Sequence, residues 1–304
     1  MTLPGMIGQV KLLGTFVLMV LLLGCGPASR SAKSNQAAGP QSATTTSPAT
    51  TASKQSAEEF AAMMLGLLQQ HATLRQQQGP DFTRDTADRL SSQVIARRVS
   101  PAFKAVIAEP TLESDQEAGF SLTGFEVWLK SLPAQKYQIV KPPLIETDTV
   151  AGYRLTASEP AASGLIRVAK SERGWELDWL SLGGPANVSL SASSEGSATF
   201  AALAFLNAVV TGKPLLAEAW IRPEARARLA PPFASDQSRG FNRGLLQRAI
   251  EDFRGMAQGY EISSLQRAGN TVTVSGKLDG KSFTLTLISS DPASRWLVDQ
   301  FDRK

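Results

Sequence analysis

The sequence of 304 residues has few of the residues that build metal centres and disulfides: it has one cysteine, Cys25, and one histidine, His71. A single cysteine excludes an intramolecular disulfide and every metal site made from several cysteines. A single histidine excludes histidine clusters and His–His dyads in the same way. We therefore expect neither a metal site nor a cofactor site.

Acidic residues are missing from the first 56 residues, which carry four bases and no aspartate or glutamate. The excess behind the formal charge of +4 and the pI of about 9.3 belongs to this segment. From 57 to 304 bases and acids balance, so this part has no broad positive field to hold a phosphate backbone. We expect no nucleic acid among the partners.

No stretch of the chain reaches 18 consecutive apolar residues, so the sequence predicts no membrane-spanning helix. A shorter apolar run, from Leu12 to Leu23, follows Lys11 and precedes the small residue Gly24. As a helix this run rises about 18 Å, well short of a bilayer core of about 30 Å. This order is typical of a secretory signal peptide, which we place at 1–24.

The end of the run, Leu22-Leu23-Gly24-Cys25, resembles the bacterial lipobox. The resemblance implies that Cys25 becomes the first residue after cleavage and that its acyl chains, palmitate among them, enter membrane lipid. Two or three acyl chains at about 0.8 kcal/mol per buried CH₂ make a stable anchor. Gly26 stands where an aspartate would favour the inner membrane, which implies the outer membrane if the organism has one and otherwise the cell surface. The alternative is an ordinary signal peptide with an unmodified cysteine.

A polar tract follows the cysteine, and we interpret 25–56 as a disordered tether. From 26 to 56 it is rich in Ser, Thr, Ala and Pro and holds no aromatic residue and no Leu, Ile, Val or Met. Such a segment buries too little apolar surface to offset its ordering entropy. As a flexible coil it spans about 30 Å, which lets a folded part stand clear of the lipid headgroups.

The remaining residues contain one pattern written twice, with matching positions about 122 residues apart. Pro101 and Pro223 each begin a helical pattern, and Trp175 and Trp296 each begin a closing strand pattern. The opening helices, at Phe60 and Phe200, differ by a larger offset, so the first copy has about 18 extra residues around 70–88. We expect a first domain at 57–182, a linker at 183–196 and a second domain at 197–304.

Each copy shows helical periodicity first and period-two alternation afterwards. Expected strands lie near 137–142, 147–157, 164–170 and 174–182, and near 260–265, 271–278, 282–288 and 295–301. Third helices are expected at 122–133 and 242–257. Helices followed by a strand meander predict an α+β fold of two tandem repeats rather than a parallel α/β sheet.

A helical start, a proline-led second helix and a meander that closes on Trp-x-hydrophobic-Asp resemble the nuclear-transport-factor-2-like (cystatin-like) superfamily. The resemblance covers both copies and implies a bent antiparallel sheet around a long helix, a cone with an open mouth. Catalytic members place an Asp or His base and a Tyr donor inside the cone. Tyr137 and Tyr260 stand at equivalent positions of the two copies, as do Asp178 and Asp299. The resemblance therefore implies these four residues as candidates for lining the cavity of each cone. The alternative, which we favour, is that the tyrosine rings pack and the aspartates cap turns.

Other candidate chemistry is sparse. Ser275–Ser282 imitates the end of a phosphate loop, but it lies between strand patterns, and we interpret Asp279-Gly280 as a hairpin turn. His71 follows the first helix in a polar stretch, and we expect it to be a solvated residue at a helix end.

Arginines gather in the helical half of the second copy, where an acidic partner is one use for them. The candidates for this patch are Arg222, Arg226, Arg228 and Arg243. The first copy has a net charge of −3 and the second of +3, so docking of the two units is another use. A third interpretation, which we favour, is a solvated face with local acidic partners.

The leading hypothesis is a lipid-anchored, extracytoplasmic binding or scaffolding module, not an enzyme, with an envelope protein or a small ligand as partner. The alternative is an enzyme with a proton-transfer or hydrolytic site in one cone, and a third possibility is a spacer with filled cones. An enzyme needs a pocket with at least two titratable groups within hydrogen-bond reach, whereas a binding module needs an open pocket without them.

Overall fold

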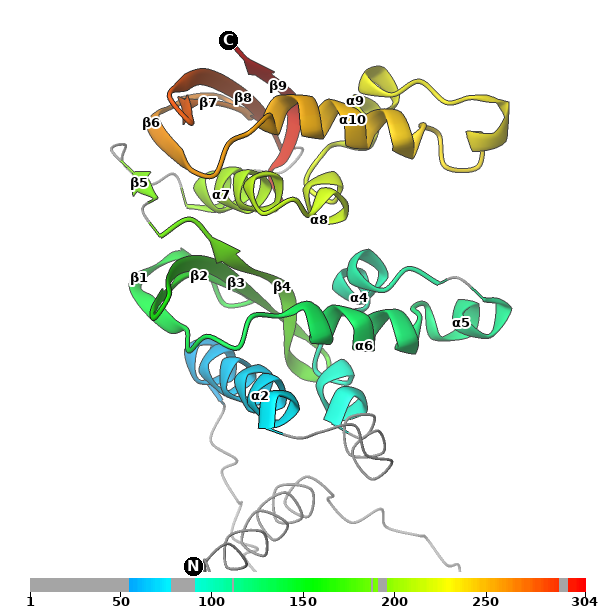
Figure 1. Ribbon diagram of the computed structural model, residues 1–304, viewed down its shortest axis with the longest axis vertical. Coiled ribbons are helices and arrows are strands. Elements are labelled where there is room, and N and C mark those ends of the chain that lie inside the picture. The colour runs from blue at the N-terminus through cyan, green and yellow to red at the C-terminus, as the bar shows by residue number, and fades with distance from the viewer. Residues whose placement is uncertain (1–54, 78–90, 111, 187, 191–195, 290–294) are drawn as a thin grey trace, which may run out of the picture. The chain divides into compact units, whose positions relative to one another are not determined.

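The computed structural model describes residues 55–77, 91–110, 112–186, 188–190, 196–289 and 295–304. The predicted signal peptide, Cys25 and the tether up to residue 54 lie outside this part. The described chain is an α+β protein in which helices precede an antiparallel sheet, and this arrangement occurs twice (Figure 1). The predicted fold class is confirmed.

The first repeat carries its helices and then four strands. The helices are α2 (Ala57–Gln77), a helical segment at 91–96, α4 (Pro101–Ile107), α5 (Glu113–Ala118) and α6 (Leu122–Ser131). The strands are β1 (Gln138–Glu146), β2 (Val150–Ser158), β3 (Ala161–Ser171) and β4 (Gly174–Gly184), and they pair antiparallel in chain order. We refer to them as sheet 1.

The second repeat follows the same order. Its helices are α7 (Ser197–Val210), α8 (Pro214–Glu218), α9 (Pro223–Leu229), the 3₁₀ turn η1 (Ala234–Asp236) and α10 (Arg243–Arg254). Its strands β6 (Tyr260–Ala268), β7 (Thr271–Leu278), β8 (Lys281–Ile288) and β9 (Leu297–Arg303) form an antiparallel meander. The short strand β5 (Ser189–Leu190) pairs parallel with β6 and completes sheet 2.

Local signals in the sequence set the helix starts. Pro101 and Pro223 occupy the first turn of α4 and α9, where the missing N–H costs no helical hydrogen bond. The Ser121 hydroxyl accepts from the Gly124 N–H at the start of α6, and the Asn242 side chain accepts from the Leu245 N–H at the start of α10. These caps stand at equivalent places in the two repeats.

A parallel bridge ties the proline-led helix to the last strand in each repeat. The Ser100 N–H donates to the Leu177 carbonyl at 2.8 Å, and the Arg222 N–H donates to the Val298 carbonyl at 2.9 Å. The same connection at matching positions supports the duplication inferred from the sequence.

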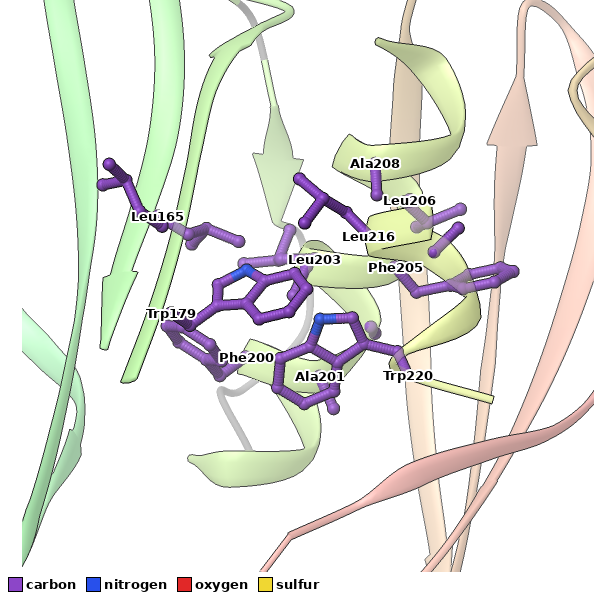
Figure 2. Packing of buried hydrophobic residues seen from close by; sticks show 14 of the residues in the cluster. Leu165, Trp179, Phe200, Ala201, Leu203, Phe205, Leu206, Ala208, Leu216 and Trp220 are labelled. Carbon is purple, nitrogen blue, oxygen red and sulfur yellow. The ribbon is translucent and has the colours of Figure 1, made fainter. Parts of the chain in front are cut away.

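The two long opening helices are buried to different extents. Helix α2 packs against β2, β3 and β4 and leaves Ala62 and Gly66 exposed. Helix α7 packs against β6, β8 and β9 of its own repeat and also against β1, β3 and β4 of sheet 1. Every residue of α7 after Ser197 is buried, and Figure 2 shows its side chains reaching both Trp179 of sheet 1 and the strands of sheet 2.

One hydrophobic core therefore runs through both repeats. Within it the Trp179 and Trp220 rings pack edge to face, with their centroids 5.0 Å apart. Gly152 of β2 allows the close approach of α7, because a Cβ there would lie 2.9 Å from Cδ2 of Phe200. Residues 53–304 form one compact unit. The division into domains at 57–182 and 197–304 stays a prediction.

Three details differ from the sequence-based expectation. His71 is not a solvated helix-end residue: it is buried, because α2 continues to Gln77, and its Nδ1 lies 3.3 Å from Oγ of Ser91. The short helices α5 and α8 and the helical segment at 91–96 were not expected, although Pro214 marks the first turn of α8. The predicted linker contains β5. No helix within the described ranges combines the length and hydropathy needed to cross a bilayer.

Candidate functional site

Each candidate aspartate lies on the last strand of its sheet and contacts the residue that precedes the proline-led helix. Asp178 accepts a hydrogen bond from the Ser100 hydroxyl at 3.0 Å and pairs with Arg167 at 3.3 Å. Asp299 pairs with Arg222 at 2.9 Å and with Arg228 at 3.1 Å. Both carboxylates are thus engaged in structural contacts at equivalent places.

The candidate tyrosines have different surroundings. The Tyr137 hydroxyl donates to Oε1 of Gln135 at 2.7 Å and accepts from the Gly183 N–H at 2.9 Å, beside a cavity of about 10 Å³. That volume holds about one water molecule. Tyr260 is 6% exposed, and no hydrogen bond joins its side chain to the described residues. Among those residues, no hydrogen bond joins either tyrosine to Asp178 or Asp299.

The arginine patch is largely engaged within the chain. Arg222 and Arg228 converge on Asp299, and Nε of Arg226 donates to the Ile221 carbonyl. Arg243 joins two carboxylates, with 3.1 Å to Glu218 of its own repeat and 2.5 Å to Glu109 of the first repeat. The Arg243–Glu109 pair is an opposite-charge contact between the repeats, as the docking alternative expected.

A larger cavity, of about 160 Å³, lies between sheet 1 and α7. Its polar lining combines Arg154 and Thr156 of β2, Ser163 of β3, Asn207 of α7 and Tyr260 of β6. Strand alternation explains the sheet contribution: Gly152, Arg154 and Thr156 share the face toward α7, while Tyr153 and Leu155 lie on the opposite face. Exposed Thr156 and Ala186 mark where the cavity meets solvent.

Two polar groups of this lining are unsatisfied. Asn207 is 1% exposed; its Nδ2 donates to Oγ of Ser181 at 2.9 Å, but its Oδ1 has no hydrogen-bond partner. The buried Nε of Arg154 also lacks a partner, and no ion pair joins Arg154 to the described residues. Unsatisfied buried polar groups are rare in folded proteins and call for a physical explanation. An ordered water molecule or a ligand in the cavity would provide one.

The ionisation of the lining is simple. Burial raises the pKa of Tyr260 well above its ordinary value of 10.0, so its hydroxyl stays protonated at physiological pH. Arg154 contributes a guanidinium group with five N–H donors. Among the lining residues, all within the described chain, no aspartate, glutamate or histidine occurs. The cavity therefore offers donors, an acceptor and one positive charge, with no base to take up a proton.

Tyr260 is the single predicted candidate that lines this larger cavity; Arg154, Thr156, Ser163 and Asn207 were missed. A signal for Asn207 was present, since it is a polar residue inside the otherwise apolar run Phe200–Val210. The location of Arg154 in a cavity could not be predicted in the same way. The sequence pattern does not indicate that a helix from the other repeat covers the second face of sheet 1.

Comparisons with known proteins add little to this geometry. No family model matches the chain, and no curated protein matches it either. A crystal structure of a cystatin-like protein from Ruminococcus gnavus ATCC 29149 is similar to it over 82% of this chain and 96% of that chain, at 9% identity and a TM-score of 0.22. The two units of helices and sheet are themselves consistent with a cystatin-like or nuclear-transport-factor-2-like fold.

Proposed function

We propose that this protein is a binding module of the cell envelope, held at the membrane outside the cytoplasm by an acylated Cys25. The sequence supports the anchor through the signal peptide, the lipobox-like Leu22-Leu23-Gly24-Cys25 and the polar tether. A tether of this length lets a folded module reach its partner away from the lipid surface. Gly26 favours the outer membrane if the organism has one, and otherwise the cell surface.

The observation that carries the binding function is the cavity between sheet 1 and α7, with unsatisfied Arg154 and Asn207 in its lining. A small ligand is favoured over an acidic protein partner, because Arg222, Arg226, Arg228 and Arg243 already have partners within the chain. Binding is favoured over proton transfer, because no carboxylate or imidazole that could act as base occurs among the described residues of the lining.

The anchor is tested by replacing the acylated residue. Cys25→Ser removes the thiol that receives the lipid, so we expect the protein to move from the detergent-rich phase to the aqueous phase in a detergent partitioning experiment. Mass spectrometry of the wild-type N-terminus shows the acyl chains directly. Unchanged partitioning of Cys25→Ser contradicts the lipoprotein proposal.

The binding function is tested with a cavity-filling variant of the full chain. Ser163→Phe places a ring in the cavity, whereas Ser282→Phe places the same ring at an exposed position of β8. In a ligand-observed NMR screen of compounds with about ten heavy atoms or fewer, we expect binders that Ser163→Phe abolishes and Ser282→Phe retains. A screen without any binder sensitive to Ser163→Phe contradicts the proposed function.

A further inference from the structure

The cavity between sheet 1 and α7 contains a positive charge without a counterion in the described chain. Arg167, on the neighbouring strand, pairs with Asp178, and Arg243 pairs with Glu218, but the Arg154 guanidinium has neither an ion pair nor a hydrogen bond with a described residue. A half-buried guanidinium presents a planar fork of N–H donors that matches an oxyanion in two parallel hydrogen bonds. An anionic group of a ligand would match this fork and would give the buried Nε its missing partner.

Neutral polar groups complete the recognition surface. Tyr260 contributes a hydroxyl that no described residue engages, and Thr156 and Ser163 contribute two more. Asn207 adds an acceptor, its unpartnered Oδ1, which lies against Gly184. Among the lining residues that the structure describes, an anion in this cavity meets several donors and no acidic side chain.

The remaining lining is apolar and favours a ligand with an apolar body. Val140, Leu165, Val188 and Leu203 face the same cavity of about 160 Å³. An engineered apolar cavity of about 150 Å³ is large enough to bind benzene. A bare inorganic anion would leave these side chains without contacts, whereas a compact apolar body would fill the space beside them.

From these three observations we infer that the cavity binds a small organic carboxylate, whose carboxylate pairs with Arg154 and whose compact apolar body lies against Leu165 and Leu203. This inference rests on the binding function proposed above and adds the chemical class of the ligand. It assigns Arg154 the role of selecting charge and the leucines the role of selecting shape.

Benzoate and benzyl alcohol test the assignment as a matched pair, because they share a ring and differ in charge. Calorimetric titration of the full chain compares the wild type with Arg154→Met, which removes the charge and keeps much of the length, and with Arg154→Lys, which keeps the charge without the fork. Lys277→Met, an exposed cation on β7, is the control for a general loss of positive charge. Thermal unfolding of each variant checks that it is folded.

We expect Arg154→Met to weaken benzoate binding about tenfold or more, Arg154→Lys to have an intermediate effect, and Lys277→Met to change it less than about twofold. Benzyl alcohol binding should change less than about twofold in all three variants. Ser163→Phe should abolish the binding of both compounds.

Three results overturn the carboxylate assignment: benzoate binding that is insensitive to Arg154→Met, inorganic phosphate that binds as tightly as benzoate, or the absence of benzoate binding. Where benzyl alcohol or another neutral compound still binds and Ser163→Phe abolishes it, the binding function stands and the ligand class alone fails. Where the fragment screen contains no compound sensitive to Ser163→Phe, the binding function fails as well.

Discussion

Arg243 joins a nearly buried carboxylate of its own repeat to an exposed carboxylate of the other repeat, and this difference sets the cost of removing it. Arg243→Met leaves the Glu218 carboxylate, 9% exposed, without its cation, and we expect a loss of about 2–3 kcal/mol in the free energy of unfolding. Arg239→Met removes an exposed partner of Glu109 and should cost less than about 1 kcal/mol. Urea unfolding measures both; equal costs contradict the burial argument.

The buried Tyr260 hydroxyl makes the free energy of unfolding decrease at alkaline pH. Burial raises its folded-state pKa above the ordinary 10.0, so above pH 10 the unfolded chain releases a proton that the folded chain retains. The stabilising contribution is complete below pH 10 and is lost as the pH rises toward the folded-state pKa. The free energies of unfolding of wild type and Tyr260→Phe, measured in urea, should therefore differ by a constant amount from pH 6 to 8. By pH 11 the wild type should have lost about 1 kcal/mol relative to Tyr260→Phe. A difference that stays constant to pH 11 contradicts this prediction.

Residue-level prediction from the sequence succeeded where the repeat itself supplied the evidence. Alignment of the two copies placed Asp178 with Asp299, and the structure gives both the same task at the start of the proline-led helix. The partners Ser100 and Arg222 were not identified, because a parallel bridge between segments far apart in the chain brings them to the aspartates. Arg154 and Asn207 were missed for the same physical reason: their cavity exists only when the repeats are packed together.

At the scale of elements, periodicity was sufficient for the strands and the longer helices, since alternation and helical spacing record which face of each element is buried. It was insufficient for α5, α8 and β5, which are too short for a period to be recognised. It also did not distinguish the environments of α2 and α7. The two helices share a pattern of apolar residues, but α7 adds apolar residues on its second face, and sheet 1 covers that face.

Matched substitutions on the opening helices test this difference. Ala62 of α2 is exposed, whereas Ala202 of α7 is fully buried; the two stand at equivalent positions of the repeats. We expect Ala62→Glu to change the free energy of unfolding by less than about 0.5 kcal/mol. Ala202→Glu buries an unpaired carboxylate and should cost more than about 3 kcal/mol or prevent folding. Chemical denaturation and soluble yield measure both effects, and a well-tolerated Ala202→Glu contradicts the coverage of α7 by two sheets.

At the scale of the molecule, the two repeats share one hydrophobic core, and duplication of a fold does not by itself produce such a core. Two copies of a fold linked in one chain need not depend on each other, but here α7 supplies core residues to both sheets, and the Trp179 and Trp220 rings meet across the repeats. The cavity lies in the same junction, so ligand binding and the packing of the repeats are coupled. A ligand that binds the folded junction and not the unfolded chain should stabilise both repeats together.

The coupling predicts one cooperative unfolding transition for residues 57–304. Hydrogen exchange at increasing urea concentrations should show the β2–β3 and β7–β8 amides losing protection at the same midpoint. Phe205 contacts Phe253 and Phe301 in the second repeat, and Phe205→Ala should cost about 3–5 kcal/mol. Because the core is shared, that loss should lower the midpoint of β2–β3 as much as the midpoint of β7–β8. If β2–β3 keeps its wild-type midpoint in Phe205→Ala, the repeats unfold independently and the shared core does not couple them.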